Sequence, residues 1–241
     1  MYGKWHLGYQ KKFSPTAHGF DDALYFLGGN CDHFLHREET CKHMLRHNGE
    51  PIHLDGIHTT DWVTERSVAF IRNKAKQRQP DEPFFLCVWH AAPHFPYQGP
   101  NDHTGELFPR DRWNKGTREE YVEMVEHMDD AIGRLLAAID IEGLRDDTLV
   151  IFMSDNGGDA RGRNLPFAGR KGGLFEGGIR EPCIIRWPGR LPQGKVVDQV
   201  TMSFDLTRSF AKIAGVRVRD DRPFDGVDII SHVMNDTRVP D

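Results

Sequence analysis

The sequence predicts an α/β fold, an α/β/α sandwich in which a mostly parallel central sheet lies between layers of helices. Two observations predict it: helical segments alternate with short apolar segments, and the apolar segments are the kind expected of buried parallel strands. A third observation concerns function, because polar clusters follow the apolar segments, where open α/β sheets place their ligand sites. The 241 residues suit one large domain.

Three segments predict helices from the spacing of their apolar residues. In the longest, Thr117 and Glu120 form a Thr-x-x-Glu capping box, and apolar residues then recur at helical spacing. Thr60 can open an earlier helix, and Gly215 can close the last one. The predicted helices are residues 60–76, 117–139 and 205–214.

Three apolar segments predict buried strands: Phe84–Trp89, Thr148–Met153 and a third that begins at Cys183. Because each segment is apolar along its whole length, we expect helices to cover both faces. On the same reasoning Cys87 and Cys183 should be small core residues. Residues 101–116 are polar and contain glycine and proline, which predicts a surface excursion near the site.

The charge composition argues against partners bound through bulk electrostatics. There are 31 basic and 36 acidic residues, a formal net charge of -5, and no long run of either sign. This predicts no bulk preference for nucleic acid or for an anionic membrane, so any anion must bind locally. No apolar stretch approaches the roughly 20 residues that cross a bilayer.

Two cysteines near histidines raise two possibilities. Cys31 and Cys41 are close enough in sequence to form a disulfide, and His33, His36 and His43 surround them. A zinc site is the alternative, although the spacing matches none of the usual zinc patterns. Both possibilities stay open from the sequence alone.

Polar residues that follow the predicted strands are candidate site residues. Asp155 and Asn156 offer adjacent oxygen donors suited to Ca²⁺ or Mg²⁺, although Asp-Asn-Gly is also good turn chemistry. Lys171 lies between glycines and could bind an anion, or could simply be solvated. His94 lies in a proline-rich segment that should hold its backbone extended, and could bind an oxyanion or protonate a leaving group. His90 could be a supporting or core histidine.

The motif "GKWHLG" at residues 3–8 carries a further pair. If this segment is extended, Lys4 and His6 share one face while Trp5 packs on the other. An ammonium and an imidazole on one face suit an anion with a proton to move.

Together these clusters resemble the sulfatase family of the alkaline-phosphatase superfamily. Five stretches carry the resemblance, in the family's order: "GKWHLG" (3–8), "APHFP" (92–96), "LVIFMSDNGG" (149–158), "GRKGGLFEGGIREPCIIRWPG" (169–189) and "FDLTRSFAKIAG" (204–215). The resemblance implies hydrolysis of a sulfate ester on an aryl or carbohydrate group. It also implies export to the periplasm, the cell exterior or the lysosome.

The resemblance assigns roles to individual residues. It implies that Lys4, His94 and Lys171 bind the sulfate, and that His94 and Lys171 also assist its leaving oxygen. It implies that His6 assists proton removal from an aldehyde hydrate nucleophile. Asp155 and Asn156 match ligands of the family's divalent ion, usually Ca²⁺, with Mg²⁺ possible.

One part of the family pattern does not match. Sulfatases carry, upstream of Gly-Lys-Trp-His, a Cys-x-Pro-Ser-Arg stretch whose cysteine becomes formylglycine, and a pair of metal-binding aspartates. None of the four cysteines of this sequence fits that stretch. We therefore expect residues 1–241 to be a sulfatase main domain without its N-terminal nucleophile and metal segment or its small C-terminal subdomain, incomplete at both ends.

This departure predicts weak Ca²⁺ affinity, poor solubility and no detectable turnover for the chain alone. Two rival functions remain open from the sequence. One is a phosphoric ester hydrolase of the same superfamily, and the other is a non-catalytic remnant that binds sulfated glycans or has no function. The identity of the substrate and the oligomeric state do not follow from the sequence.

Overall fold

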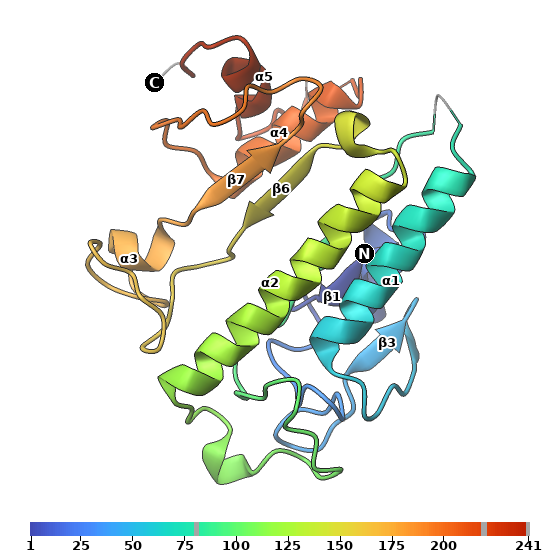
Figure 1. Cartoon of the computed structure of the whole chain (residues 1–241), viewed down its shortest axis with the longest axis vertical. Helices are drawn as coiled ribbons and strands as arrows, with labels where there is room; N and C mark the ends of the chain where they lie inside the picture. Colours follow the sequence, from blue (N-terminus) through green and yellow to red (C-terminus); the bar gives the residue numbers. More distant parts are fainter. Residues whose placement is uncertain (80–81, 218–220, 240–241) are drawn as a thin grey trace. The chain divides into compact units, whose positions relative to one another are not determined.

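The computed structural model describes residues 1–79, 82–217 and 221–239, which divide into two compact units (Figure 1). Unit 1 comprises Met1–Leu144 and Met153–Pro182. Unit 2 comprises Arg145–Phe152 and Cys183–Asp241. The residues of the candidate site, from Lys4 to Lys171, all belong to unit 1.

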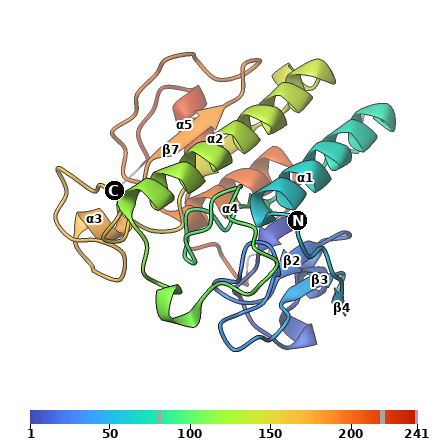
Figure 2. The ribbon, with the colours of Figure 1, turned by 60° about the horizontal axis from the view of Figure 1, so that its bottom comes forward.

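Unit 1 contains a five-stranded sheet in the order β4-β3-β2-β1-β5. The strands are β1 (Tyr2–Lys4), β2 (Leu24–Phe26), β3 (Leu45–His47), β4 (Glu50–Pro51) and β5 (Val88–Trp89). β1 pairs in parallel with β2 and β5, whereas the β2–β3 and β3–β4 pairings are antiparallel. Figure 2 shows β2, β3 and β4 side by side. The α/β class is confirmed, and the sheet is mixed in its pairing.

Two long helices of unit 1 run side by side (Figures 1 and 2). They are α1 (Thr59–Lys76), which also packs on β1 and β5, and α2 (Arg118–Ile141). The predicted capping box is present, because Thr117 accepts from the Glu120 backbone and the Glu120 carboxylate accepts from the Thr117 backbone. Short 3₁₀ turns occur at Lys11–Phe13, Pro15–His18 and Arg110–Arg112, and α3 spans Glu176–Ile179.

The main core of unit 1 lies between the sheet and α1. Leu24, Tyr25 and Phe26 of β2 are almost fully buried and pack with Trp62 of α1. The aromatic ring of Trp5 stacks on Trp89, with centroids 5.8 Å apart. These contacts fix the carboxyl end of β1, where the first candidate site residue lies.

The predicted strand at 84–89 forms regular ladder pairs only at its end. β5 consists of Val88 and Trp89, which pair with Tyr2 and Gly3 of β1. Upstream, Phe85 is 60% exposed, so the expected cover on both faces is wrong there. The physical reason is that only its end has a strand partner, while Phe85 rests at the edge against Phe20.

Unit 2 contains a separate two-stranded sheet, formed by β6 (Val150–Met153, whose last residue belongs to unit 1) and β7 (Cys183–Arg186). Its remaining elements are the 3₁₀ turn Arg145–Asp147, α4 (Ser203–Ile213) and α5 (Ile229–Met234). The predicted third helix is thus confirmed, and Gly215 follows it with φ of +66°.

Within unit 2, one face of the β6–β7 sheet packs on a core. Ile151 and Ile185 join the apolar cluster built around Ile230, whereas Phe152 and Ile184 are exposed. Unit 2 by itself therefore covers these strands on one face, where cover on both faces was expected. Cys183 is likewise exposed rather than in the core, because it lies at the start of β7.

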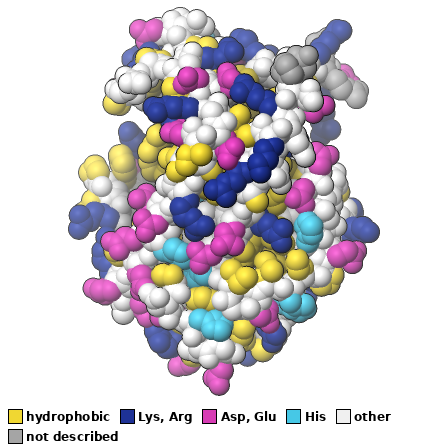
Figure 3. Space-filling model, turned by 45° about the vertical axis from the view of Figure 1, so that its right-hand side comes forward, with side chains coloured by type: hydrophobic (Ala, Val, Ile, Leu, Met, Phe, Trp, Pro, Cys, Tyr) yellow, Lys and Arg dark blue, Asp and Glu magenta, His cyan; other side chains and the backbone are white. Residues whose placement is uncertain are grey.

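The surface carries both charge signs interspersed, as Figure 3 shows for one face of the molecule. Within the described residues, no helix combines the length and the apolar character needed to cross a membrane. Residues 101–116 lie mostly at the surface, as predicted. Trp113 is buried and anchors this segment, and its Nε1 donates to Asn30 Oδ1 at 3.1 Å.

Candidate active site

Lys4 lies at the carboxyl end of β1, where a close backbone approach holds it. Gly3 has φ of +121°, and a Cβ atom there would lie 1.9 Å from the carbonyl oxygen of Trp89. Only glycine allows β1 and β5 to pair at this position. The GKWHLG motif therefore needs its first glycine for the sheet, and this sets the position of the half-buried Lys4.

His6 does not continue the alternation of β1. The strand ends at Lys4, and His6 has φ of +53°, so the expected extended geometry is wrong at this residue. Trp5 is buried as predicted, and His6 is exposed. The imidazole of His6 packs against Gly29, where a Cβ atom would lie 2.6 Å from its Cε1.

His94 lies in a turn rather than in an extended segment. Its backbone N–H donates to Ala91 O at 2.9 Å, and its Nδ1 lies 2.9 Å from Phe95 O. The prolines on either side shape this turn instead of extending the backbone. Because Nδ1 donates its proton to a carbonyl, the neutral ring carries its lone pair on Nε2.

A buried polar network fixes the segment that carries His94. His33 Nε2 lies 3.3 Å from the carbonyl oxygen of His94, and the His33 backbone N–H donates to Gln98 Oε1 at 2.8 Å. Gln98 in turn donates to Asp32 Oδ2 at 3.2 Å, and Phe108 N donates to the same oxygen at 2.8 Å. The network joins the segment that precedes β3 to the segment of His94 and to the loop of residues 101–116.

Sequence reasoning did not find Asp32 and Gln98 as supporting residues, and it considered His33 only for zinc. All three are buried polar side chains in loops, and no local motif marks them. Their positions become meaningful only once the fold brings residues about 65 apart in the chain into contact.

Asp155 and Asn156 follow β6 on a loop that packs against α3. Gly157 N donates to Gly178 O at 3.1 Å, and a Cβ at Gly157 would lie 2.0 Å from Gly177 O. Asn156 Nδ2 donates to Gly157 O at 3.1 Å, which leaves its amide oxygen for another partner. Asp155 is exposed.

Lys171 belongs to the same loop assembly. Its backbone N–H donates to Gly158 O at 3.1 Å, and Asn164 bridges the loop by accepting from Gly158 N and donating to Gly158 O, both at 2.9 Å. The glycine-rich segment therefore has a defined backbone path. Lys171 itself is exposed.

The structure brings five of the six sequence-predicted site residues into mutual electrostatic range. Burial lowers the pKa of Lys4, and the positive charge of Lys171 lowers it further while Asp155 opposes both. Burial likewise lowers the pKa of His94 to about 4, with Lys4 and Lys171 contributing in the same direction. The pKa of His6 is lowered by burial and by both lysines. Three chain segments thus place two lysines, two imidazoles and a carboxylate within electrostatic range of one another.

Glu181 adds a second carboxylate near Asp155. Burial raises the pKa of Glu181, and the negative charge of Asp155 raises it further. Its Oε1 is buried and has no hydrogen-bond partner among the described residues. The sequence analysis did not single out this residue, although it lies within the GGIREP stretch.

The residues beside the lysines fit a hard divalent cation in their chemistry. Asp155 and Asn156 supply a carboxylate and an amide oxygen, and the unpartnered Oε1 of Glu181 shows that this region leaves a buried acceptor unsatisfied. The two predicted ligands are fewer than the six to eight oxygens, roughly, that Ca²⁺ takes.

The cysteines do not fit the role of a formylglycine precursor. Cys31 is the one whose charge acts on Lys4, but it is buried, and desolvation together with Asp32 raises the pKa of its thiol well above the usual range. Cys41 and Cys183 are exposed on other segments, and Cys87 joins the core next to β5 as predicted. No described cysteine therefore combines a reactive thiol with a place in this site.

The two possibilities raised for Cys31 and Cys41 are not realised. Both thiols are free, one buried and the other exposed, so they form no disulfide. The described residues also place neither cysteine in a group of potential metal ligands. Of the surrounding histidines, His43 instead lies with His53 and Asp55.

His90 is a partly buried histidine rather than an exposed one. Its two ring nitrogens are buried and have no hydrogen-bond partner among the described residues. Burial lowers its pKa to about 4, and His127 lowers it further. The imidazole is therefore neutral at pH 7.

A cationic site at the end of a parallel strand pair, with oxygen donors beside it, is typical of α/β enzymes that act on anionic esters. The sulfatase family model matches residues 1–216, so the chain belongs to the sulfatase family.

Similar proteins cover the same range of the chain. N-acetylgalactosamine-6-sulfatase of Mus musculus is 30% identical over 256 residues, which cover 96% of this chain and 45% of that protein. Arylsulfatase J of Mus musculus is 31% identical over 250 residues, which cover 100% of this chain and 40% of that protein. The chain thus spans less than half the length of these curated relatives.

Solved structures agree with the fold. The crystal structure of Ps i-CgsB in complex with k-i-k-neocarrahexaose matches with a TM-score of 0.84 and 30% identity, covering 98% of this chain and 55% of that one. The PsFucS1 sulfatase from Pseudoalteromonas sp. matches with a TM-score of 0.73 and 24% identity, covering 97% of this chain and 51% of that one. At this identity the likeness supports the fold alone. The expected sulfatase-like α/β fold is confirmed.

Proposed function

We propose that this chain binds the sulfate group of a sulfated carbohydrate and forms part of a sulfuric ester hydrolase that removes it. The observation that supports the proposal is electrostatic: Lys171 lowers the pKa of Lys4, and both lysines lower that of His94, so these side chains of three separate segments lie within range of one another's charge. The similarity to carbohydrate sulfatases supports it.

The chemistry of each side chain suits this role. Two ammonium groups offset the negative charge on sulfate oxygens, and they already act on each other in the free chain. An anion between them would reverse the electrostatic bias on His94 and allow its ring to take up a proton, which it can later give to the leaving oxygen.

His6 has the properties of a proton acceptor. Its lowered pKa keeps the imidazole neutral at pH 7, so that a lone pair is available. Its exposed position at the end of the motif leaves it accessible to a reacting group. None of the four cysteines of this chain is suited to be that reacting group. We therefore assign no nucleophilic step.

Asp155 and Asn156 are the residues we propose to hold a divalent ion, Ca²⁺ in first place and Mg²⁺ as the alternative. When bound, such an ion would add positive charge next to the sulfate oxygens. With only these two protein oxygens, we expect weak affinity of the chain for Ca²⁺ and no turnover by the chain alone.

The test is isothermal titration calorimetry with N-acetylgalactosamine 6-sulfate, its unsulfated parent sugar and the corresponding 6-phosphate. We expect saturable binding of the sulfated sugar and none of the unsulfated sugar. Equal binding of the sulfated and unsulfated sugars, or of neither, would contradict the proposal.

The same titration separates the rival functions. Tighter binding of the phosphate than of the sulfate would favour a phosphoric ester hydrolase, which the family relationship does not favour. Binding of 4-nitrophenyl sulfate in place of the sugar sulfate would move the substrate class to aryl sulfates. Sugar sulfate binding that Lys171→Ala leaves unchanged would favour a glycan-binding surface elsewhere.

A further inference from the structure

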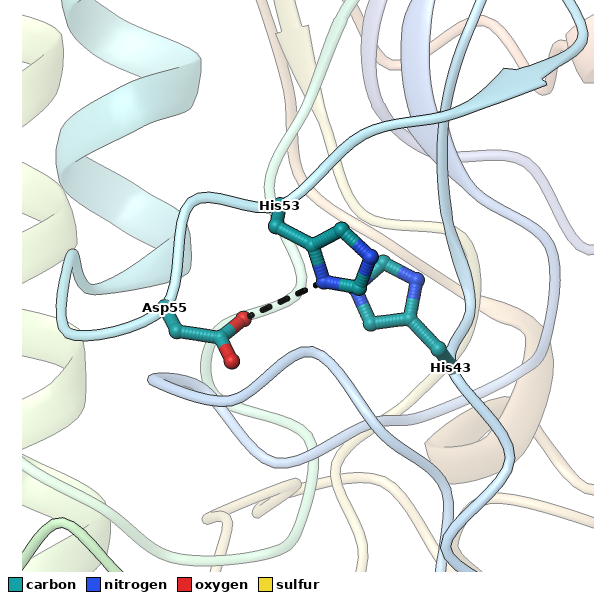
Figure 4. Close-up of side chains that lie close together, drawn as sticks. All are labelled: His43, His53 and Asp55. Atoms are coloured by element: carbon teal, nitrogen blue, oxygen red, sulfur yellow. Dashed lines mark ion pairs between the residues drawn. The ribbon is translucent and has the colours of Figure 1, made fainter.

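Three side chains of unit 1 form a cluster that the candidate active site does not use: His43, His53 and Asp55 (Figure 4). One donor atom from each lies within 4.8 Å of the other two. The two imidazole centroids are 4.1 Å apart, with ring planes at 37°. Asp55 Oδ1 lies 3.9 Å from His53 Nδ1.

The β3–β4 hairpin positions the cluster. His43 lies just before β3, and His53 and Asp55 follow β4, so the three residues come from the two open ends of one hairpin. Below them the strands are paired through Arg46 and Pro51. The hairpin therefore brings the two chain segments that carry the donor atoms close together.

The imidazole of His43 is free to bind a ligand. Both of its ring nitrogens are buried, and neither has a hydrogen-bond partner among the described residues. An imidazole nitrogen without a hydrogen-bond partner is free to bind a metal through its lone pair.

We propose that His43, His53 and Asp55 form a binding site for Zn²⁺. Two imidazole nitrogens and one carboxylate oxygen are a donor set that Zn²⁺ accepts, with a fourth, open position for water. Zinc–ligand bonds of about 2.0–2.1 Å imply ligand separations of about 3.3 Å in a tetrahedron, so the side chains close by a small rotation from their present distances.

Arg37 opposes a cation at this site. Its Nη2 lies 3.5 Å from Asp55 Oδ2, so its positive charge competes with a metal ion for that carboxylate. Oδ1 of Asp55 remains on the His53 side for the metal. Removing the charge of Arg37 should therefore tighten Zn²⁺ binding.

A second cluster with the same residue types serves as the natural comparison. His58, Asp61 and His127 also lie within 4.8 Å of one another. However, His58 Nδ1 accepts from Thr60 N at 3.2 Å and its Nε2 lies 3.1 Å from Gln98 O. His127 Nε2 lies 3.0 Å from Asp61 Oδ1. Internal hydrogen bonds already use both ring nitrogens of His58, Nε2 of His127 and Oδ1 of Asp61; of the ring nitrogens, only Nδ1 of His127 has no partner among the described residues, so we infer no metal there.

The experiment is a Zn²⁺ titration of the chelator-treated chain by isothermal titration calorimetry at pH 7.5. We expect one saturable site. His43→Ala and His53→Ala should each weaken Zn²⁺ binding by at least about 10–100-fold. Loss of a residue that only hydrogen-bonds to a metal ligand already has an effect of that size, and loss of a ligand should have a larger one. Asp55→Asn tests the carboxylate with little change in shape, and should also weaken binding.

The matched control is His127→Ala, which removes a histidine from the comparison cluster and should leave Zn²⁺ affinity unchanged. Arg37→Gln should raise the affinity severalfold. Substitution with Co²⁺ reports the ligands by absorption, and a thiolate-to-cobalt charge-transfer band would show that Cys41, two residues from His43, replaces the proposed donors.

Three outcomes would overturn the proposal: no saturable Zn²⁺ binding, binding that His43→Ala and His53→Ala leave intact, or that charge-transfer band. Circular dichroism of each variant shows whether it is folded. If His43→Ala fails to fold, the His53→Ala and Asp55→Asn titrations decide the question.

Discussion

Nε2 of His33 lies 3.3 Å from the carbonyl oxygen of His94, so a fully buried imidazole supports the backbone of a candidate site residue. The other ring nitrogen of His33 bonds to Thr59 Oγ1, at the start of α1. The assignment of protons is consistent, with Nε2 donating to the carbonyl and Nδ1 accepting from the hydroxyl. The position of His94 thus depends on α1 through one side chain.

His33→Ala should lower the free energy of unfolding by about 2–4 kcal/mol, because it leaves a cavity and unpaired polar groups. Binding of a sulfated sugar should weaken as well. Urea unfolding measures the first effect and calorimetry the second. The exposed His103→Ala is the control, with stability expected within about 0.5 kcal/mol of the unaltered chain. Equal stability of the two variants would show that the His33 network contributes little.

Gly3→Ala should destabilise the chain by about 3 kcal/mol or more, because φ is +121° and the new Cβ would lie 1.9 Å from Trp89 O. Gly133→Ala is the matched substitution in α2, where nothing lies within 4 Å of the new Cβ. It should stabilise by about 0.5–1 kcal/mol. Urea unfolding of both variants tests the opposite signs, and a tolerated Gly3→Ala would contradict the described approach of β1 to β5.

Acid should destabilise the chain at a pH well above the carboxylate range. Burial lowers the pKa of His33, His36, His90 and His94 to about 4, and that of His58 to about 3. The unfolded chain protonates these histidines near pH 6.5, whereas the folded chain does not until about pH 4. Their stabilising contribution is therefore complete above pH 6.5 and is lost as the pH falls towards 4.

Urea unfolding at a series of pH values measures this loss, which should approach about 1.4 kcal/mol per pH unit for each histidine. His90→Gln should reduce the slope of unfolding free energy against pH by the contribution of one histidine. The substitution leaves no hydrogen-bond partner unpaired, because the His90 ring nitrogens have none among the described residues. Stability that stays constant between pH 6.5 and 4.5 would contradict the burial of these imidazoles.

Binding of sulfate should take up a proton at His94. In the free chain its pKa is about 4, lowered by burial and by Lys4 and Lys171, so the ring is neutral at pH 7. A bound anion raises that pKa, and affinity should then fall as pH rises through the value in the complex. Calorimetry in buffers of different ionisation enthalpy measures the proton uptake. His94→Gln should abolish it, and uptake that persists in this variant would assign the proton to another group.

The long elements were predictable from local chemistry. The Thr117 capping box and the apolar spacing after it place α2 within two residues of its observed end, and Gly215 marks the end of α4. The short strands β1 to β4 were not predicted as strands, because two or three residues carry no periodicity. Their pairing is set by contacts between distant segments.

The candidate site was predictable as a set of residue types and not as a geometry. The motifs identified Lys4, His94, Asp155 and Lys171, which the fold then brings into electrostatic range. The backbone at His94 was expected to be extended, and this was wrong. It turns there because the backbone N–H of His94 donates to Ala91 O, a contact that the flanking prolines do not reveal. Strand burial was overestimated for β7, because apolar sequence alone does not show which face finds a partner.

The most direct test of the central claim is the affinity for N-acetylgalactosamine 6-sulfate of Lys4→Ala, Lys171→Ala and the control Lys76→Ala, which removes an exposed lysine from the end of α1. Each site lysine should account for about 10–100-fold in affinity, the usual worth of a hydrogen bond from a charged group, and the control should match the unaltered chain. Equal affinities for all three variants would contradict a sulfate site formed by Lys4 and Lys171.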